Sequence, residues 1–198
     1  MNSTVSGAHR LQVKIFIHGS APPLEPFIPV FHQWIKQKRF PELLIDVANY
    51  AHVPKGPGVG LVGHESEYFI DQGEGRAGLL YTRKRDGSAN GDGLGRAFRR
   101  ALHAAILLER EEAFAGTLRF GSNELQLCVA DRLRAPSSPA TFAALRPELD
   151  AFCSKLFGSG GYQLTLASTP RQLFTVAIGA EGDASLAELL ERLGGPLS

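Results

Sequence analysis

Four short apolar segments follow one another between residues 43 and 82, and glycine-rich connections join them. The segments are Leu43–Val47, Val59–Gly63, Ser66–Asp71 and Ala77–Thr82. Parallel neighbours need a crossover of about a dozen residues or more, usually a helix, whereas antiparallel neighbours need only a turn. Because no helical pattern separates these segments, the region predicts consecutive antiparallel strands.

The rest of the chain alternates between strand and helix periodicity. Residues 11–18 alternate apolar and polar side chains, which is typical of a strand with one buried face. Further strands are predicted at 117–120, 124–130, 162–168 and 173–178, and helices at about 26–39, 94–114, 139–157 and 184–193. The predicted order, β-α-β-β-β-β-α-β-β-α-β-β-α, favours an α+β fold with mostly antiparallel sheet and about four helices.

The polar first ten residues are predicted to form a mobile tail, followed by a single α+β domain over residues 11–198. An alternative division places two subdomains on either side of the glycine-rich loop 83–95. Residues 13–47 and 125–166 also share the pattern strand, proline-bearing loop, helix, strand. An internal duplication is therefore a further hypothesis.

The net charge and the cysteine content restrict the functions that the chain could have. The net charge is +1, so no global field attracts nucleic acid or an anionic membrane. Cys128 and Cys153 lie in apolar segments, which predicts two buried thiols in a reducing compartment. The first ten residues lack a signal-peptide pattern, and no apolar run approaches the ~20 residues that span a bilayer. We therefore expect a cytoplasmic protein without a membrane partner.

Gly58, Gly60 and Gly63 match the G-x-G-x-x-G pattern of phosphate-binding loops and are candidate ligand-binding residues. In a dinucleotide site this pattern directly follows a strand and opens a helix, whose N-terminus holds the pyrophosphate. Here a strand pattern continues after the glycines, so the context does not fit. The sequence instead favours glycines that permit tight turning or close backbone packing.

A histidine and carboxylate group surrounds these glycines. His52, His64 and Asp46 are candidate catalytic residues and Glu65 is a candidate ligand-binding residue, because histidine transfers protons near neutral pH. The three catalytic candidates converge only if strands 43–47 and 59–71 place them together. The H-E-x-x-H motif is absent, so no metal site is predicted.

A basic region provides candidate partner-binding residues. Between residues 83 and 100 there are six cations and two acids. The candidates are Arg83, Lys84, Arg85, Arg96, Arg100, His103 and Leu107. A flexible basic loop followed by a basic helix face would attract an acidic protein or nucleic acid. Few aromatic residues accompany the patch, and acids follow it at 109–112, so a nucleic acid is the less favoured partner.

No catalytic constellation emerges, since the chain has no G-x-S-x-G elbow and neither cysteine lies in an activating setting. We therefore expect a non-catalytic partner- or ligand-binding α+β module, acting through residues 83–110 or the glycine-rich edge 52–65. A second hypothesis is a small-molecule enzyme or carrier that uses the histidine and carboxylate group near residues 52–65, with a histidine as general base or as a metal ligand outside any known signature. A weak nucleic-acid binder is the third. The sequence identifies no cofactor and leaves the oligomeric state open.

Overall fold

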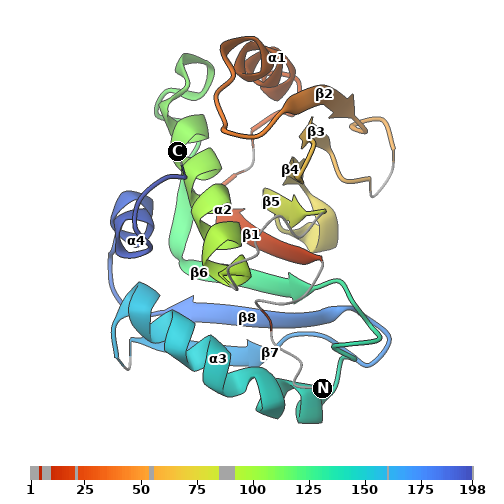
Figure 1. Cartoon of the computed structure of the whole chain (residues 1–198). Helices are drawn as coiled ribbons and strands as arrows, with labels where there is room; N and C mark the ends of the chain where they lie inside the picture. Colours follow the sequence, from red (N-terminus) through yellow and green to blue (C-terminus); the bar gives the residue numbers. More distant parts are fainter. Residues whose placement is uncertain are drawn as a thin grey trace.

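The computed structural model describes residues 5, 10–20, 22–53, 56–84, 92–159 and 161–197. Eight strands form one antiparallel sheet in the order β2-β3-β4-β5-β1-β6-β8-β7 (Figure 1). The strands are β1 (Leu11–Ile17), β2 (Leu44–Asn49), β3 (Val59–Gly63), β4 (Ser66–Asp71), β5 (Gly78–Arg83), β6 (Phe120–Val129), β7 (Tyr162–Leu166) and β8 (Phe174–Ala180). The helices are α1 (Phe27–Gln37), α2 (Gly93–Arg110), α3 (Pro139–Phe157) and α4 (Leu186–Arg192), with short 3₁₀ turns η1 (Gly73–Gly75) and η2 (Glu112–Phe114). The predicted α+β class and antiparallel sheet are confirmed.

The α-helices of the described chain lie on one face of the sheet, which we call the helix face (Figure 1). Alternate residues of a strand point to opposite faces, so each strand divides its side chains between the two sides. On the helix face, two rows of apolar side chains cross β5, β1, β6 and β8. One row is Tyr81, Val13, Leu127 and Val176, and the next is Leu79, Ile15, Leu125 and Ile178. All eight are buried, so this face forms the core.

The opposite side of the sheet, which we call the open face, carries the alternate residues of these strands, five of which are polar in the two rows below. The first row is Thr82, Gln12, Cys128 and Thr175, and the second is Leu80, Lys14, Gln126 and Ala177. No helix of the described chain packs on this face. The predicted alternation of β1 thus separates a core face from a polar face at the centre of the sheet.

The two halves of the fold have related topologies. In each half a central strand is followed by a helix and then by the strand at the outer edge of the sheet. From that edge a meander of antiparallel strands leads back, and its last strand pairs with the central strand. A second helix follows. The first half runs β1-α1-β2-β3-β4-β5-α2 and the second runs β6-α3-β7-β8-α4. The central strands β1 and β6 pair with each other, and α2 packs against α4. The first half therefore differs by one additional hairpin in its meander.

One predicted hairpin is wrong. The segments 117–120 and 124–130, with a turn at 121–123, form no pair of strands, because Phe120–Val129 is the single strand β6. Ile17 pairs with Phe120 and Ile15 pairs with Leu125, so β6 has extra residues opposite β1 at this point. The turn-forming residues produce a bulge, and pairing with β1 and β8 on either side keeps the chain extended.

Within the predicted tail, residues 1–4 and 6–9 lie outside the described residues, while Val5 is buried and its N–H donates to Glu148 Oε2 at 2.7 Å. In the described part of the chain, no helix has the length and apolar character required to cross a membrane.

Candidate functional site

The G-x-G-x-x-G pattern does not form a phosphate loop. Gly60 and Gly63 lie within β3, which pairs with β2 on one side and β4 on the other, and the chain continues into β4 and not into a helix. The N–H groups of a strand with two neighbours are used in sheet pairing and cannot cradle a phosphate. The strand context therefore does not fit a phosphate loop, and a ligand-binding role for these glycines stays a prediction.

Each glycine has its own packing reason instead. Gly58 has a φ of +79°, and a Cβ there would collide with the Ile70 carbonyl. A Cβ on Gly60 would enter the ring of Phe69, and one on Gly63 would lie 2.9 Å from Glu42 Cδ. These glycines are required for close approach of strands and side chains.

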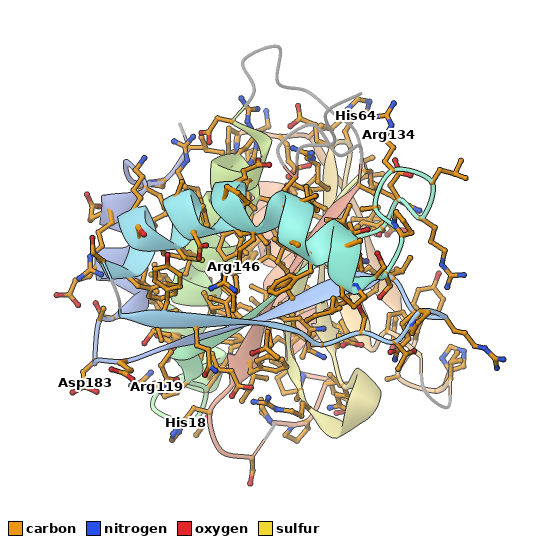
Figure 2. The ribbon with its side chains drawn as sticks, turned by 90° about the horizontal axis from the view of Figure 1, so that it is seen from below. His18, His64, Arg119, Arg134, Arg146 and Asp183 are labelled. Carbon is orange, nitrogen blue, oxygen red and sulfur yellow. The ribbon has the colours of Figure 1, made fainter. Side chains whose placement is uncertain are left out.

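The catalytic candidates do not come together. His52 lies at the turn after β2, next to the Asn49–Val59 pair, whereas His64 follows the Leu44–Gly63 pair at the opposite end of the same ladder. At about 3.3 Å per residue, the strand length separates the two histidines by roughly 15 Å. His64 lies at the periphery of the molecule in Figure 2.

Asp46 is exposed in the middle of the β2–β3 ladder, and its Oδ1 accepts a hydrogen bond from the Val47 N–H at 2.8 Å. The structure therefore does not bring His52, His64 and Asp46 together, and the catalytic role of each stays a prediction. The described residues contain no group of three or more histidine, cysteine, aspartate or glutamate side chains that could hold a metal ion.

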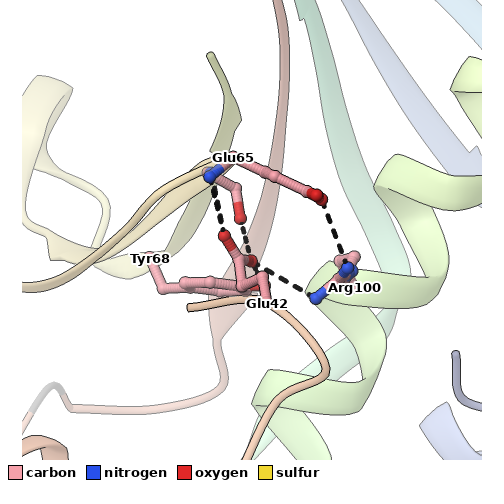
Figure 3. Close-up of polar contacts among 5 residues, drawn as sticks. Glu42, Glu65, Tyr68 and Arg100 are labelled. Atoms are coloured by element: carbon pink, nitrogen blue, oxygen red, sulfur yellow. Dashed lines mark hydrogen bonds and ion pairs between the residues drawn. The ribbon is translucent and has the colours of Figure 1, made fainter. Parts of the chain in front are cut away.

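Arg100 belongs to a buried cluster around Glu42 (Figure 3). Arg100 Nη1 lies 3.3 Å from Glu42 Oε1, and Arg100 Nη2 lies 3.6 Å from Glu65 Oε2. The Glu42 carboxylate also accepts hydrogen bonds from the N–H groups of Glu65 and Ser66, from the Ser66 hydroxyl and from the Tyr68 hydroxyl. Such a carboxylate is tolerated in the interior because its oxygens are saturated with donors and a cation balances its charge.

The cluster ties the turn between β3 and β4 to α2 and to the loop before β2. Burial, and next the charge of Glu42, raise the pKa of Tyr68 well above its ordinary value, and burial raises the pKa of Tyr81 to about 12. Both phenols therefore stay neutral and act as hydrogen-bonding groups. The Arg100 side chain is buried in this cluster and is not part of an exposed basic face, and the binding roles of Arg100 and Glu65 stay predictions.

The other candidates of the basic region do not share one exposed face. Arg83 is buried at the end of β5, Lys84 Nζ lies 3.4 Å from Glu67 Oε1, and Arg85 lies outside the described residues. His103 is half-buried against the ring of Phe40. Leu107 is half-buried and packs against the core, and Arg96 is half-exposed. The described candidates therefore form no continuous exposed basic face, because α2 packs against the sheet and α4, and their partner-binding role stays a prediction.

The outer edge of the sheet at β2 concentrates exposed apolar side chains. Five large hydrophobic residues are exposed in the described chain, and four of them lie in or next to β2. They are Leu43, Ile45, Tyr50 and Val53. β2 has a neighbour on one side only, so its other edge faces solvent. An apolar edge strand is a template for pairing with another strand.

The open face holds a groove of about 440 Å³ over β5, β1, β6 and β8. Its floor includes Gln12, Lys14, Gln126 and Cys128, and its rim includes Arg132 and Arg171 from two loops. A smaller hollow of about 180 Å³ shares Lys14 and Gln126 with it and extends toward Arg76 and Glu124. We call the larger hollow the groove.

Two charged pairs lie on the open face, one in the groove and one in the smaller hollow beside it. Lys14 is only 7% exposed, and its Nζ lies 2.5 Å from Asp71 Oδ2. Gly78 makes this possible, because the Lys14 side chain passes over its backbone, with Cε only 3.1 Å from where a Cβ would stand. Beyond Lys14, the Arg76 guanidinium stacks on the Phe16 ring at 3.9 Å and pairs with Glu124.

The rim loops are tied to each other. Arg132 Nη2 donates to the Arg171 carbonyl oxygen at 2.7 Å, and the hydroxyls of Ser137 and Ser168 are 2.7 Å apart. Ser168 Oγ also accepts from the Thr175 N–H of β8 at 3.0 Å. These contacts hold the wall of the groove against the sheet.

The chain matches no protein-family model, and a search of the curated proteins gives no match either.

Sequence reasoning missed both Glu42 and the groove. Glu42 has a local signal in the sequence, because it is an acid among the apolar residues of the segment 40–45. Asp46, the catalytic candidate, has the same signal. The groove residues carry a weaker signal, the polar positions of the alternating strand β1. Nothing in the sequence shows that this polar face lies at the centre of the sheet.

Proposed function

We propose that the protein is a non-catalytic ligand-binding α+β module whose site is the groove on the open face. The observation that carries the proposal is a hollow of about 440 Å³ whose polar floor lies on the central strands of the sheet. Ligand sites of proteins commonly have volumes of about 300 to 1,000 Å³ and a few convergent polar groups. Rigid strands supply the floor here, which favours a pre-formed site.

The chemistry of the groove favours binding over catalysis. Its described lining contains no histidine, and its one carboxylate, Asp71, is already engaged by Lys14 and by the Gly73 N–H. A general base requires an acceptor that can reach the substrate proton. The groove offers amides, hydroxyls and cations, which are groups that recognise and orient a ligand.

A blocking substitution tests the proposal. Gln126→Trp fills the floor of the groove, and Gln37→Trp introduces the same side chain at an exposed position on α1. Thermal unfolding is measured with a panel of small neutral, anionic and cationic metabolites. A ligand at a hundred times its Kd adds about 2.7 kcal/mol, which raises Tm by roughly 5 to 10 °C for a chain of this size.

We expect at least one compound to raise Tm for the wild-type protein and for Gln37→Trp but not for Gln126→Trp. If no compound stabilises the wild-type protein, or if the stabilisation survives Gln126→Trp, the groove is not the site and the proposal fails.

The edge of β2 supports a second candidate function, association with a second copy of the chain. β2 has no strand partner on its outer edge in the described chain, and Leu43 and Ile45 are exposed beside it, so an identical strand could pair there next to the Val47 N–H that donates to Asp46 Oδ1. Analytical ultracentrifugation of the wild-type protein and of Ile45→Lys tests this candidate. A concentration-dependent dimer that Ile45→Lys abolishes supports it, and a monomer at all concentrations removes it.

A further inference from the structure

The charges around the groove are unequal in sign. The charged residues among its described lining are Lys14, Arg132, Arg171 and Asp71, which leaves two net positive charges. The whole chain carries a net charge of only +1, so the excess is local. A hollow lined by one sign of charge over a low-dielectric floor concentrates ligands of the opposite sign.

The single carboxylate does not offset this preference. Asp71 Oδ2 lies 2.5 Å from Lys14 Nζ, and Asp71 Oδ1 accepts from the Gly73 N–H at 3.1 Å. A cationic ligand would therefore find its natural partner occupied. Lys14 has three N–H donors, and only two of them are directed at Asp71 and at the Gly73 carbonyl. Lys14 Nζ also lies 5.6 Å from the centre of the Phe16 ring, and Lys14 lines the groove, so its third donor is the one left for an acceptor there.

The two arginines of the rim come from loops that the fold holds together. Arg132 follows β6 and Arg171 precedes β8, and the Arg132 guanidinium reaches the Arg171 main chain at 2.7 Å. Both side chains are exposed, so their remaining donors face solvent at the mouth of the groove. Guanidinium groups bind carboxylate and phosphate oxygens through paired hydrogen bonds.

We infer that the groove binds a small organic anion, with Arg132 and Arg171 holding its carboxylate or phosphate at the rim and Lys14 and Gln126 contacting its polar body on the floor. This inference rests on the proposed function and specifies the ligand class of the same site. A carboxylate and a phosphate present the same acceptor chemistry to these groups, so separate probes distinguish the two sources.

Cys128 provides a readout at the site itself. It lies on the floor of the groove with 9% exposure, whereas Cys153 is fully buried and burial raises its pKa to about 12. Alkylation by iodoacetamide, followed by mass spectrometry of the intact protein, therefore reports access to the groove. Cys128→Ser identifies the signal.

The probes are two matched pairs at millimolar concentration. Succinate is compared with succinamide, and glycerol 3-phosphate with glycerol, so each pair differs mainly in charge. The variant Arg132→Gln with Arg171→Gln removes the rim cations. Arg134→Gln is the control, since Arg134 lies on the same loop as Arg132, is exposed and does not line the groove. Circular dichroism verifies that each variant is folded.

We expect one or both anions to slow alkylation of Cys128 in the wild-type protein and in Arg134→Gln, with binding about tenfold weaker in the double arginine variant. The pair that responds identifies carboxylate or phosphate as the preferred group. If the neutral compounds protect Cys128 and the anions do not, or if the double variant binds the anions unchanged, the anion inference is overturned while the proposed function stands. If no compound of any charge protects Cys128, both are overturned.

Discussion

Alanine at position 63 would introduce one methyl group beside the buried Glu42 carboxylate. Its Cβ would lie 2.9 Å from Glu42 Cδ and 3.2 Å from the Ser66 carbonyl oxygen. Carbon atoms in favourable contact are about 3.5 to 4.0 Å apart, so the carboxyl group must move by roughly 0.6 to 1 Å. Glu42 Oε2 accepts from the N–H groups of Glu65 and Ser66 at 3.1 and 3.0 Å, and such a shift disrupts both hydrogen bonds.

The expected loss of stability follows from these two effects. Overpacking a buried site costs about 1 to 3 kcal/mol, and a hydrogen bond to a charged group contributes about 1.5 to 3 kcal/mol. We therefore expect Gly63→Ala to lower the free energy of unfolding by about 3 to 5 kcal/mol. Urea denaturation measures this change; with a slope of about 2 to 3 kcal/mol per molar, the midpoint falls by roughly 1 to 2 M.

Gly179 provides a matched control, because it also lies in a strand and an added Cβ there would meet no heavy atom within 4 Å. Gly179→Ala should change the stability by less than about 1 kcal/mol. The double variant Gly63→Ala with Glu42→Gln should cost less than the sum of the two single changes, since both act on one contact. Equal small effects of the two glycine substitutions, or strict additivity, would refute the reasoning.

Glu42→Gln removes the charge that balances Arg100 while the same donors still face the site, and we expect urea denaturation to show a loss of about 3 to 5 kcal/mol; a loss below about 1 kcal/mol would contradict this role. Burial, and next three neighbouring arginines, lower the pKa of His103, so the folded state binds fewer protons than the unfolded state. Stability should therefore fall as the pH drops below about 6.5 toward the lowered pKa, and His103→Gln should flatten that decline; an unchanged slope would exclude His103 as its source. Iodoacetamide should modify Cys128 well before Cys153, as peptide mapping can show, and the reverse order would contradict the position of Cys128 in the groove.

The fold class could be predicted because periodicity is a local property of the sequence. The alternation in β1 and the apolar stripe of α1 depend on residues within one element, and the structure places both where the pattern indicates. The segment 120–129 shows the limit of this approach. Its glycine, serine and asparagine favour a turn. The residues before and after them pair with β1, and those after them also pair with β8, so the three form a bulge within one strand.

The surroundings of single residues could not be predicted, because they depend on neighbours distant in the sequence. Arg100 has the spacing of an exposed helix position, and only the approach of Glu42 shows that it is buried. Gly63 completes a nucleotide-binding pattern, and only the packing of Glu42 against it gives the physical reason for the glycine. Lys14 is one polar residue of an alternating strand until β5 and β6 enclose it in a groove.

The pairing of β1 with β6 joins the two halves of the sheet, and it also sets an order of events on the ribosome. β1 can pair with β5 soon after residue 83 emerges, but its other side stays open until β6 is complete at residue 129. At elongation rates of about 5 to 20 residues per second, the nascent chain spends several seconds with β1 paired on one side only. During that interval the strand that later lies deepest in the sheet is the edge most open to wrong partners.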